Sequence, residues 1–308
     1  MSASTDAPRR LTVADIAKRH ADGLRLPMLT AYDFPTAQIL DRAGIPLILV
    51  GDSLGQVMLG YESTVRVTMA EMVHHTKAVV RGTQRAMVIG DMPFLTYASM
   101  DEALDNAGRF LQEAGAQAVK VEGGVRSARI IEGLVKAGIP VMGHIGWTPQ
   151  AGLAMSGTGG RPKVQGRSRD QARSMLADAL AVQEAGAFSI VLELVPAQLA
   201  AAITERLRIP TIGIGAGPGC SGQVQVVTDL LGLGDFIPKH ARPYAQLGAT
   251  IDAAARAYAA DVEAGTFPGE AETVRMDDEV LDHVLGRGAH DRASGEIPVG
   301  GIPLDRDL

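Results

Sequence analysis

Short apolar runs recur along the chain, and most of them follow the same kind of lead-in. An Ala-Gly pair ends an amphipathic stretch, as glycine suits the left-handed residue just past a helix. The apolar run that follows does not alternate with polar residues, so both faces of each strand are predicted to be buried, as in a parallel sheet. The segments with this pattern are DRAGIPLILVGDS (41–53), QEAGAQAVKVEGG (112–124), VKAGIPVMGHIG (135–146) and QEAGAFSIVLELVP (183–196).

Eight strands are expected in all, and helical patterns separate most of them. The clearest helices span 68–82, 101–115 and 168–186. Strands that alternate with helices predict an α/β fold, a closed (βα)8 TIM barrel. An open doubly wound sheet is the competing interpretation, although no Gly-x-Gly-x-x-Gly motif follows the first strand. The expected strands are 27–31, 47–51, 87–91, 118–122, 141–145, 189–194, 211–215 and 235–239.

The last part of the chain has a different composition. A final amphipathic helix is predicted over 250–264 and a short helix around 276–286. From Gly265 onward the sequence is polar, with Gly, Pro and Asp recurring, which is typical of extended or poorly ordered segments. We therefore expect one catalytic barrel domain over 1–268, with an N-terminal helix, and an extended or partly disordered tail over 269–308.

Composition excludes several classes of partner. The chain has 308 residues, of which 46% are apolar, and a formal net charge of −6. Nothing in that balance favours nucleic acid or an anionic membrane. The single cysteine, Cys220, fits a reducing cytoplasm. No apolar run marks a signal peptide or approaches the roughly 20 residues of a membrane span.

Polar residues follow the predicted strands at the point where each strand ends. The carboxyl ends of barrel strands build the active site of such folds, so these side chains are expected to converge there. Several acids at one place repel one another unless a cation or protons neutralise them. The residues are Tyr32-Asp33, Asp52-Ser53, Asp91, Glu122, His144, Glu193 and His240.

Three of these acids predict a metal site. Asp52, Asp91 and Glu122 would offer oxygen ligands from neighbouring strands, and a small set of oxygen ligands suits Mg²⁺. Lys120 lies two residues before Glu122 and so points to the same face, where its ammonium group can bind a substrate anion. One such acid alone is more often a helix cap than a ligand, but the whole set at matching positions favours a site.

Other candidates are less specific. A lone histidine such as His144 is more often structural than catalytic, although its expected place at the barrel end balances that preference. The pair His74-His75 is predicted to lie on a polar helix surface. The glycine-rich segment 213–223 is only a weak signal for phosphate binding, and Cys220 within it is expected to be a small turn residue.

Several longer motifs resemble one known family. Together they span roughly residues 10–268 and are similar to the ketopantoate hydroxymethyltransferases, also called 3-methyl-2-oxobutanoate hydroxymethyltransferases. The motifs are LTAYDFPTA (29–37), the segment 49–82 that begins LVGDSLGQV, GDMPF (90–94), VKVEGG (119–124), GHIGWTPQ (143–150), KVQGRS (163–168), LELVP (192–196) and GIGAGPGCSGQ (213–223).

The resemblance implies a barrel of the phosphoenolpyruvate/pyruvate superfamily type in a cytoplasmic homo-oligomer, typically a decamer. It implies transfer of a hydroxymethyl group from 5,10-methylenetetrahydrofolate to 3-methyl-2-oxobutanoate, giving 2-dehydropantoate for pantothenate and coenzyme A biosynthesis. A Mg²⁺-stabilised enolate would be the nucleophile.

The resemblance also implies roles for individual residues. The magnesium ligands would be Asp52, Asp91 and Glu122. The keto acid would contact Asp52, Ser53, Asp91 and Lys120. Glu193 would be the general base that removes the C3 proton, and His144 matches an active-site histidine of the family.

Two other interpretations remain open at this point. A lyase or mutase of the same superfamily, such as an isocitrate-lyase-like or phosphonopyruvate enzyme, would share the barrel and the magnesium. The chain has no Lys-Lys-Cys-Gly-His motif, which counts against the lyase. A non-catalytic paralogue would retain only the fold, and such a protein is expected to lose its ligands.

Overall fold

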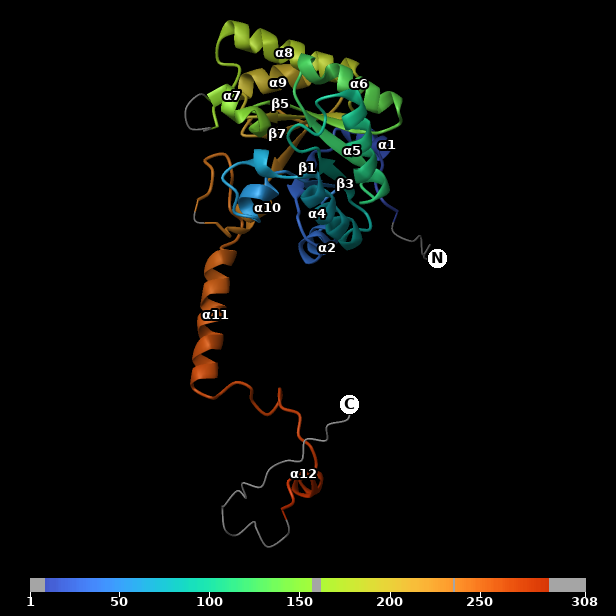
Figure 1. The fold of residues 1–308 in the computed structure, drawn as a ribbon. Helices are drawn as coiled ribbons and strands as arrows, with labels where there is room; N and C mark the ends of the chain where they lie inside the picture. Colours follow the sequence, from blue (N-terminus) through green and yellow to red (C-terminus); the bar gives the residue numbers. More distant parts are fainter. Residues whose placement is uncertain (1–8, 157–161, 235, 288–308) are drawn as a thin grey trace, which may run out of the picture. The chain divides into compact units, whose positions relative to one another are not determined.

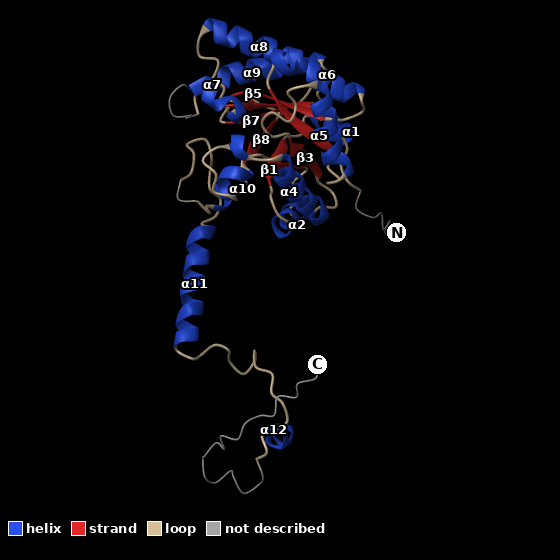
Figure 2. Ribbon diagram, in the orientation of Figure 1, coloured by secondary structure: helices blue, strands red, loops and turns tan. Residues whose placement is uncertain are grey.

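Eight parallel strands form a closed barrel in chain order, so the predicted (βα)8 fold is confirmed. The computed structural model describes residues 9–156, 162–234 and 236–287. Figure 2 shows the strands enclosed by helices. The strands are β1 (Leu26–Thr30), β2 (Leu47–Val50), β3 (Met87–Asp91), β4 (Ala118–Glu122), β5 (Val141–Gly146), β6 (Ser189–Glu193), β7 (Thr211–Ile214) and β8 (Gly222–Gln225).

The eighth strand is not where the sequence predicted it, and the expectation for 235–239 was wrong. Strand β8 lies instead at the end of the glycine-rich segment 213–223 and extends beyond it to Gln225. It is a short strand in which buried and exposed residues alternate, so it lacks the apolar run used to find the others. Gly222 is required there, because a Cβ would overlap the Leu26 carbonyl oxygen of β1.

Helices cover the outside of the barrel in the connections from β1 to β7 (Figure 1). Capping boxes start α4, α5 and α8, in which a Thr or Ser side chain and the Glu or Gln three residues later bond each other's backbone. The three clearest predicted helices are confirmed. The helices are α1 (Val13–Ala21), α2 (Phe34–Arg42), α3 (Leu54–Val57), α4 (Met69–Gly82), α5 (Met100–Gln112), α6 (Ala128–Lys136), α7 (Gly152–Ser156), α8 (Arg169–Glu184), α9 (Ala197–Arg206) and α10 (Val227–Leu231).

The barrel interior is filled by side chains from alternate strand positions, as the two-residue period of a strand requires. Ile16 of α1 packs into this interior cluster against the first residues of the strands, so α1 closes the amino end of the barrel. The strand residues of the cluster are Leu26, Met28, Leu47, Leu49, Met87, Ile89, Ala118, Met142, Val191, Ile212 and Val224.

The chain divides into two compact units, Met1–Ala249 and Thr250–Leu308. Helices α11 (Leu247–Glu263) and α12 (Asp278–Val284) lie close to the ranges predicted for them, and neither has a buried residue. The domain boundary expected at 268 stays a prediction. None of the helices among the described residues has the length and apolar character that a bilayer crossing needs.

Replacing Ile16 by alanine is expected to lower the free energy of unfolding by about 2–5 kcal/mol, because the side chain is only 1% exposed inside the barrel. Ile39→Ala is the matched control, since that side chain is 57% exposed. Urea unfolding of both variants measures the difference. Equal losses for the two variants would show that α1 does not close the barrel.

Candidate active site

Strand alternation places three charged side chains on the inside of the barrel at its carboxyl end. Asp91 follows the interior residue Ile89 by two positions, and Lys120 and Glu122 follow Ala118 by two and four. Asp91 and Lys120 are also register partners across β3 and β4. The apolar side chains inside the barrel are therefore followed, at its carboxyl end, by a layer of charged side chains.

The same alternation brings in His144 and Glu193. His144 follows interior Met142, and Glu193 follows interior Val191. Glu122 and His144 are register partners between β4 and β5. The predicted histidine and the predicted base therefore belong to the same end of the barrel as the three acids.

Lys120 is the buried cation of this group. Its Nζ lies 2.7 Å from Asp91 Oδ1, 4.0 Å from Glu122 Oε1 and 3.2 Å from His144 Nδ1. Burial lowers the pKa of Lys120, but Asp91, Glu122 and Asp52 outweigh that effect and raise it. Lys120 therefore keeps its positive charge at the centre of the acids.

In each of the three acids, one oxygen is held by a donor of the protein. Asp52 Oδ2 accepts from Gln150 Nε2 at 3.0 Å, and Glu122 Oε2 accepts from the Gln150 backbone N–H at 3.2 Å. Asp91 Oδ2 accepts from the Asp52 backbone N–H at 3.1 Å. The other oxygens of Asp91 and Glu122 face positive groups, because Asp91 Oδ1 lies 2.7 Å from Lys120 Nζ and Glu122 Oε1 lies 3.3 Å from His144 Nδ1.

Electrostatics around these acids favours a further cation. Burial raises the pKa of Asp52 well above its usual value, and the nearby charges of Asp91 and Glu122 raise it further. Burial also raises the pKa of Asp91. A divalent ion would relieve this repulsion, and oxygens of this kind are the ligands that Mg²⁺ prefers.

The three acids do not yet surround a common point. Within the described ranges, no three His, Cys, Asp or Glu side chains form a ready-made set of metal ligands. The ammonium group of Lys120 is paired with Asp91. Three buried carboxylates beside one lysine nevertheless fit a metal ion, because buried negative charge needs counter-charge.

Glu193 is more accessible than the other acids, with a side chain that is 17% exposed. Its Oε2 lies 3.2 Å from His144 Nε2, and the other ring nitrogen lies 3.3 Å from Glu122 Oε1. Burial and Lys120 lower the pKa of His144, but the two glutamates outweigh them and raise it to about 9. A protonated His144 therefore links the predicted base to a predicted metal ligand.

The backbone around Glu193 is tightly constrained. Its carbonyl oxygen accepts from the Trp147 N–H at 2.8 Å. Leu194, the next residue, is in the left-handed region with φ 50°, which is uncommon for a branched side chain. Gly146 has φ 96°, and a Cβ there would overlap the Glu193 carbonyl oxygen. Glycine is thus needed where β5 passes Glu193.

Ser53 and Tyr32 lie together at the ends of β2 and β1. The Tyr32 hydroxyl and Ser53 Oγ are 2.9 Å apart, and Tyr32 is fully buried. His75 Nδ1 contacts the Tyr32 carbonyl oxygen at 2.7 Å. The prediction that His74 and His75 both lie on the surface is correct for His74 but wrong for half-buried His75.

Two residues expected at strand ends have other roles or positions. Asp33 caps the start of α2, because its side chain accepts a hydrogen bond from the Thr36 N–H. Its role is therefore to stabilise this helix. His240 lies in a turn and not at the end of a strand, because the strand predicted before it does not form. Sequence reasoning missed two further residues, Gln150 and Tyr97. The Tyr97 hydroxyl donates a hydrogen bond to Gln150 Oε1 at 2.6 Å.

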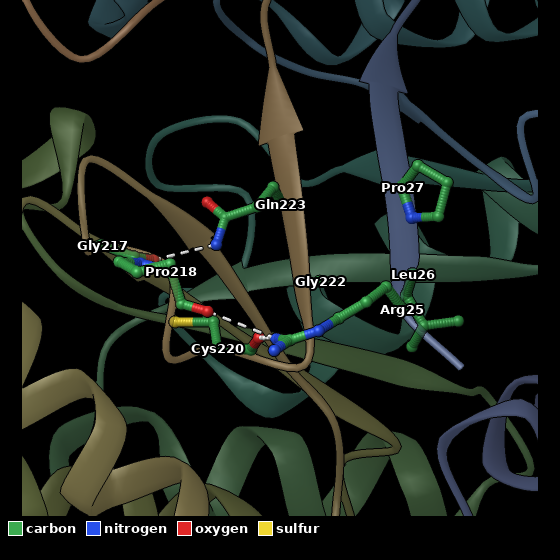
Figure 3. Close-up of a pocket in the computed structure, with 8 residues that line it drawn as sticks. All are labelled: Arg25, Leu26, Pro27, Gly217, Pro218, Cys220, Gly222 and Gln223. Atoms are coloured by element: carbon green, nitrogen blue, oxygen red, sulfur yellow. Dashed lines mark hydrogen bonds between the residues drawn. The ribbon is translucent and has the colours of Figure 1, made fainter. Parts of the chain in front are cut away.

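A hollow of about 690 Å³ lies at the opposite, amino end of the barrel (Figure 3). Arg25 donates to the carbonyl oxygens of Pro218 and Cys220, which ties the β7–β8 loop to the start of β1. None of the predicted site residues lines this hollow. Its lining residues are Arg25, Leu26, Pro27, Gly217, Pro218, Cys220, Gly222 and Gln223.

Comparisons with known proteins agree on one family. A family model described as ketopantoate hydroxymethyltransferase matches residues 10–270. A 3-methyl-2-oxobutanoate hydroxymethyltransferase of Chloroflexus aurantiacus is 65% identical over 278 residues, covering 90% of this chain and 97% of that protein. One of Dehalococcoides mccartyi is 56% identical over 277 residues, covering 89% and 97%.

Solved structures with a similar fold are distant in sequence. Phosphonopyruvate hydrolase, in complex with oxalate and Mg²⁺, has a TM-score of 0.54 at 14% identity, covering 90% of this chain and 99% of that one. The 2,3-dimethylmalate lyase, a member of the PEP mutase/isocitrate lyase superfamily, has a TM-score of 0.54 at 15% identity, covering 92% and 97%. These structures share the (βα)8 fold with this chain.

Gly146→Ala is expected to destabilise the protein more than Gly138→Ala. Both glycines have positive φ, so each alanine costs about 1–2 kcal/mol of strain. Only at Gly146 does the new Cβ also meet backbone, while nothing lies within 4 Å at Gly138. Thermal denaturation should therefore show a melting temperature at least about 5 °C lower for Gly146→Ala. Equal melting temperatures would mean that the backbone beside Glu193 is not constrained.

Proposed function

The chain belongs to the ketopantoate hydroxymethyltransferase family, and we propose that it runs this reaction at the carboxyl end of its barrel, with Asp52, Asp91 and Glu122 as magnesium ligands. It has ketopantoate hydroxymethyltransferase activity in pantothenate biosynthesis, which implies 5,10-methylenetetrahydrofolate as co-substrate. The observation that carries the assignment of residues is the set of three buried acids, each with one oxygen bonded to a neutral N–H donor, beside Lys120 and Glu193.

The reaction needs a carbanion at C3 of 3-methyl-2-oxobutanoate. A proton beside a ketone is too weakly acidic to leave unaided at neutral pH. Bound by the three acids, Mg²⁺ would supply positive charge where negative charge develops on the keto oxygen. The three buried carboxylates, with only one lysine beside them, support that place for the ion.

Lys120 and Ser53 bind and orient the keto acid in this proposal. The Lys120 ammonium is fixed among the acids and keeps its charge, so it attracts the substrate anion. Ser53 begins α3 directly after Asp52, and its hydroxyl is held by Tyr32, which positions it for a carboxylate oxygen. The two contacts would fix which face of C3 is presented to the base.

Glu193 is the general base that removes the C3 proton. It is the most accessible acid of the group, and its backbone is held in place on both sides. His144 lies against Glu193 Oε2 and balances the negative charge of this carboxylate, which stays partly exposed. The resulting enolate would attack the methylene carbon that the folate delivers, and water would then replace the folate nitrogen on that carbon, giving the hydroxymethyl product and tetrahydrofolate.

The two other interpretations have no comparable support. The lyase and the hydrolase share only the fold with this chain, at 14–15% identity. A paralogue without activity is expected to lose its ligands, whereas all three acids are present and gathered at one end.

The homo-oligomer, typically a decamer, and the cytoplasmic location remain part of the proposal. The exposed apolar residues of α11, such as Tyr258 and Val262, agree with an assembly.

Glu193→Gln is expected to slow exchange of the C3 hydron of 3-methyl-2-oxobutanoate with solvent by at least about 100-fold, because the amide cannot accept the proton. Proton NMR in D₂O follows this exchange without folate. Binding of the keto acid with Mg²⁺, measured by calorimetry, should stay within threefold of the unchanged protein. Exposed Glu184→Gln is the matched control. Exchange at the unchanged rate in Glu193→Gln would exclude it as the base.

Removal of divalent metal is expected to abolish formation of the hydroxymethyl product, and Mg²⁺ is expected to restore it. Product formation is followed after treatment with a chelator and again after Mg²⁺ is added in excess. The chelator presaturated with Mg²⁺ serves as the control. Full turnover after thorough metal removal would refute the magnesium role of the three acids.

A further inference from the structure

We propose that Gln150 is a positioning residue that holds two of the three magnesium ligands, and that Tyr97 fixes the orientation of its amide. This inference rests on the proposed magnesium site. Gln150 was part of the matched motif GHIGWTPQ, but nothing in the sequence gave it a role. The structure places it between Asp52 and Glu122 with only 5% of the residue exposed.

Gln150 uses both its side chain and its backbone on the acids. Its side-chain Nε2 donates to Asp52 Oδ2 at 3.0 Å and to the Met92 carbonyl oxygen at 2.9 Å. Its backbone N–H donates to Glu122 Oε2 at 3.2 Å. Both protons of the amide are therefore used in hydrogen bonds. Gln150 bonds one oxygen of Asp52 through its side chain and one oxygen of Glu122 through its backbone.

Tyr97 determines which way the amide points. Its hydroxyl donates to Gln150 Oε1 at 2.6 Å. The two partners of Nε2, a carboxylate oxygen of Asp52 and a carbonyl oxygen of Met92, only accept hydrogen bonds. A reversed amide would set its oxygen against two acceptors and its nitrogen against the hydroxyl. The four groups thus fit together in one orientation.

The contacts join segments from four different strand ends. Gln150 lies in the 3₁₀ turn η3 (Pro149–Ala151) after β5, and Tyr97 lies between β3 and α5. Asp52 follows β2, and Glu122 is the last residue of β4. A single neutral side chain with its backbone therefore fixes ligands that come from strands two places apart in the barrel.

A neutral donor suits this position for a physical reason. A fourth acid would add to the repulsion among three buried carboxylates, and a second lysine would compete with the metal ion. The amide adds no net charge, and it holds one oxygen of Asp52 while leaving the other available. Groups that orient metal ligands in this way typically change metal affinity by about 10–100-fold when removed.

Gln150→Leu tests the side chain alone, because the backbone N–H that holds Glu122 is retained. The probe is Mg²⁺ itself, titrated by calorimetry into the metal-free protein in the presence of 3-methyl-2-oxobutanoate and without folate. The Kd for Mg²⁺ is expected to rise at least about tenfold. Gln112→Leu is the matched control, since Gln112 is exposed at the end of α5 and should leave the Kd unchanged.

Tyr97→Phe is the second variant, and it removes only the hydroxyl that orients the amide. Its Kd for Mg²⁺ is expected to rise in the same direction but less, at about threefold or more, while the melting temperature stays near that of the unchanged protein. This variant keeps the test decisive if Gln150→Leu does not fold.

The outcomes separate this inference from the proposed function. If the unchanged protein binds Mg²⁺ and a folded Gln150→Leu binds it within twofold of the same Kd, Gln150 does not position the ligands. The inference is also overturned if Tyr97→Phe leaves the Kd unchanged when Gln150→Leu cannot be obtained folded. If the unchanged protein binds no Mg²⁺, the magnesium site itself is wrong, and the role of Gln150 is rejected with it.

Discussion

Three carboxylates lie almost fully buried around one ammonium group at the carboxyl end of the barrel, and their mutual repulsion governs what the surrounding residues must do. Carboxylates in such a place need donors, counter-charges or a metal ion. Lys120 supplies one positive charge, and three backbone or amide donors each hold one oxygen. The negative charge left over is what a divalent ion could neutralise, so the electrostatics of this end of the barrel favour a further cation.

The scaffold divides the work between strands and loops. Strand alternation sets the inward direction of Lys120, Glu122 and Glu193, because each continues the row of apolar side chains below it. The segments after the strands add what a strand cannot place, namely the Ser53 hydroxyl and the Gln150 amide. Interior packing thus gives the charged groups their precision, while the connecting segments provide the hydrogen bonds that complete them.

The fold and most of the site could be predicted from sequence, because continuous apolar runs that end in acids indicate buried parallel strands with polar groups gathered at their carboxyl ends. Strand β8 could not, since Gly222–Gln225 is short, partly exposed and free of the apolar run that marks the other strands. Gln150 was missed for a different reason. Its importance comes from contacts with Asp52, 98 residues earlier in the chain, and no local pattern reveals such a contact.

The closed sheet is not equally well joined around its circumference. β5 and β6 share five register pairs, whereas β7 and β8 share only two, and no helix forms in residues 215–221 between them. Few backbone bonds and little apolar cover make local opening inexpensive in free energy. Amide protons of β8 should therefore exchange with solvent sooner than those of β4 to β6, so the barrel is expected to open locally at β8 and at the connection from β7 while β4 to β6 stay closed.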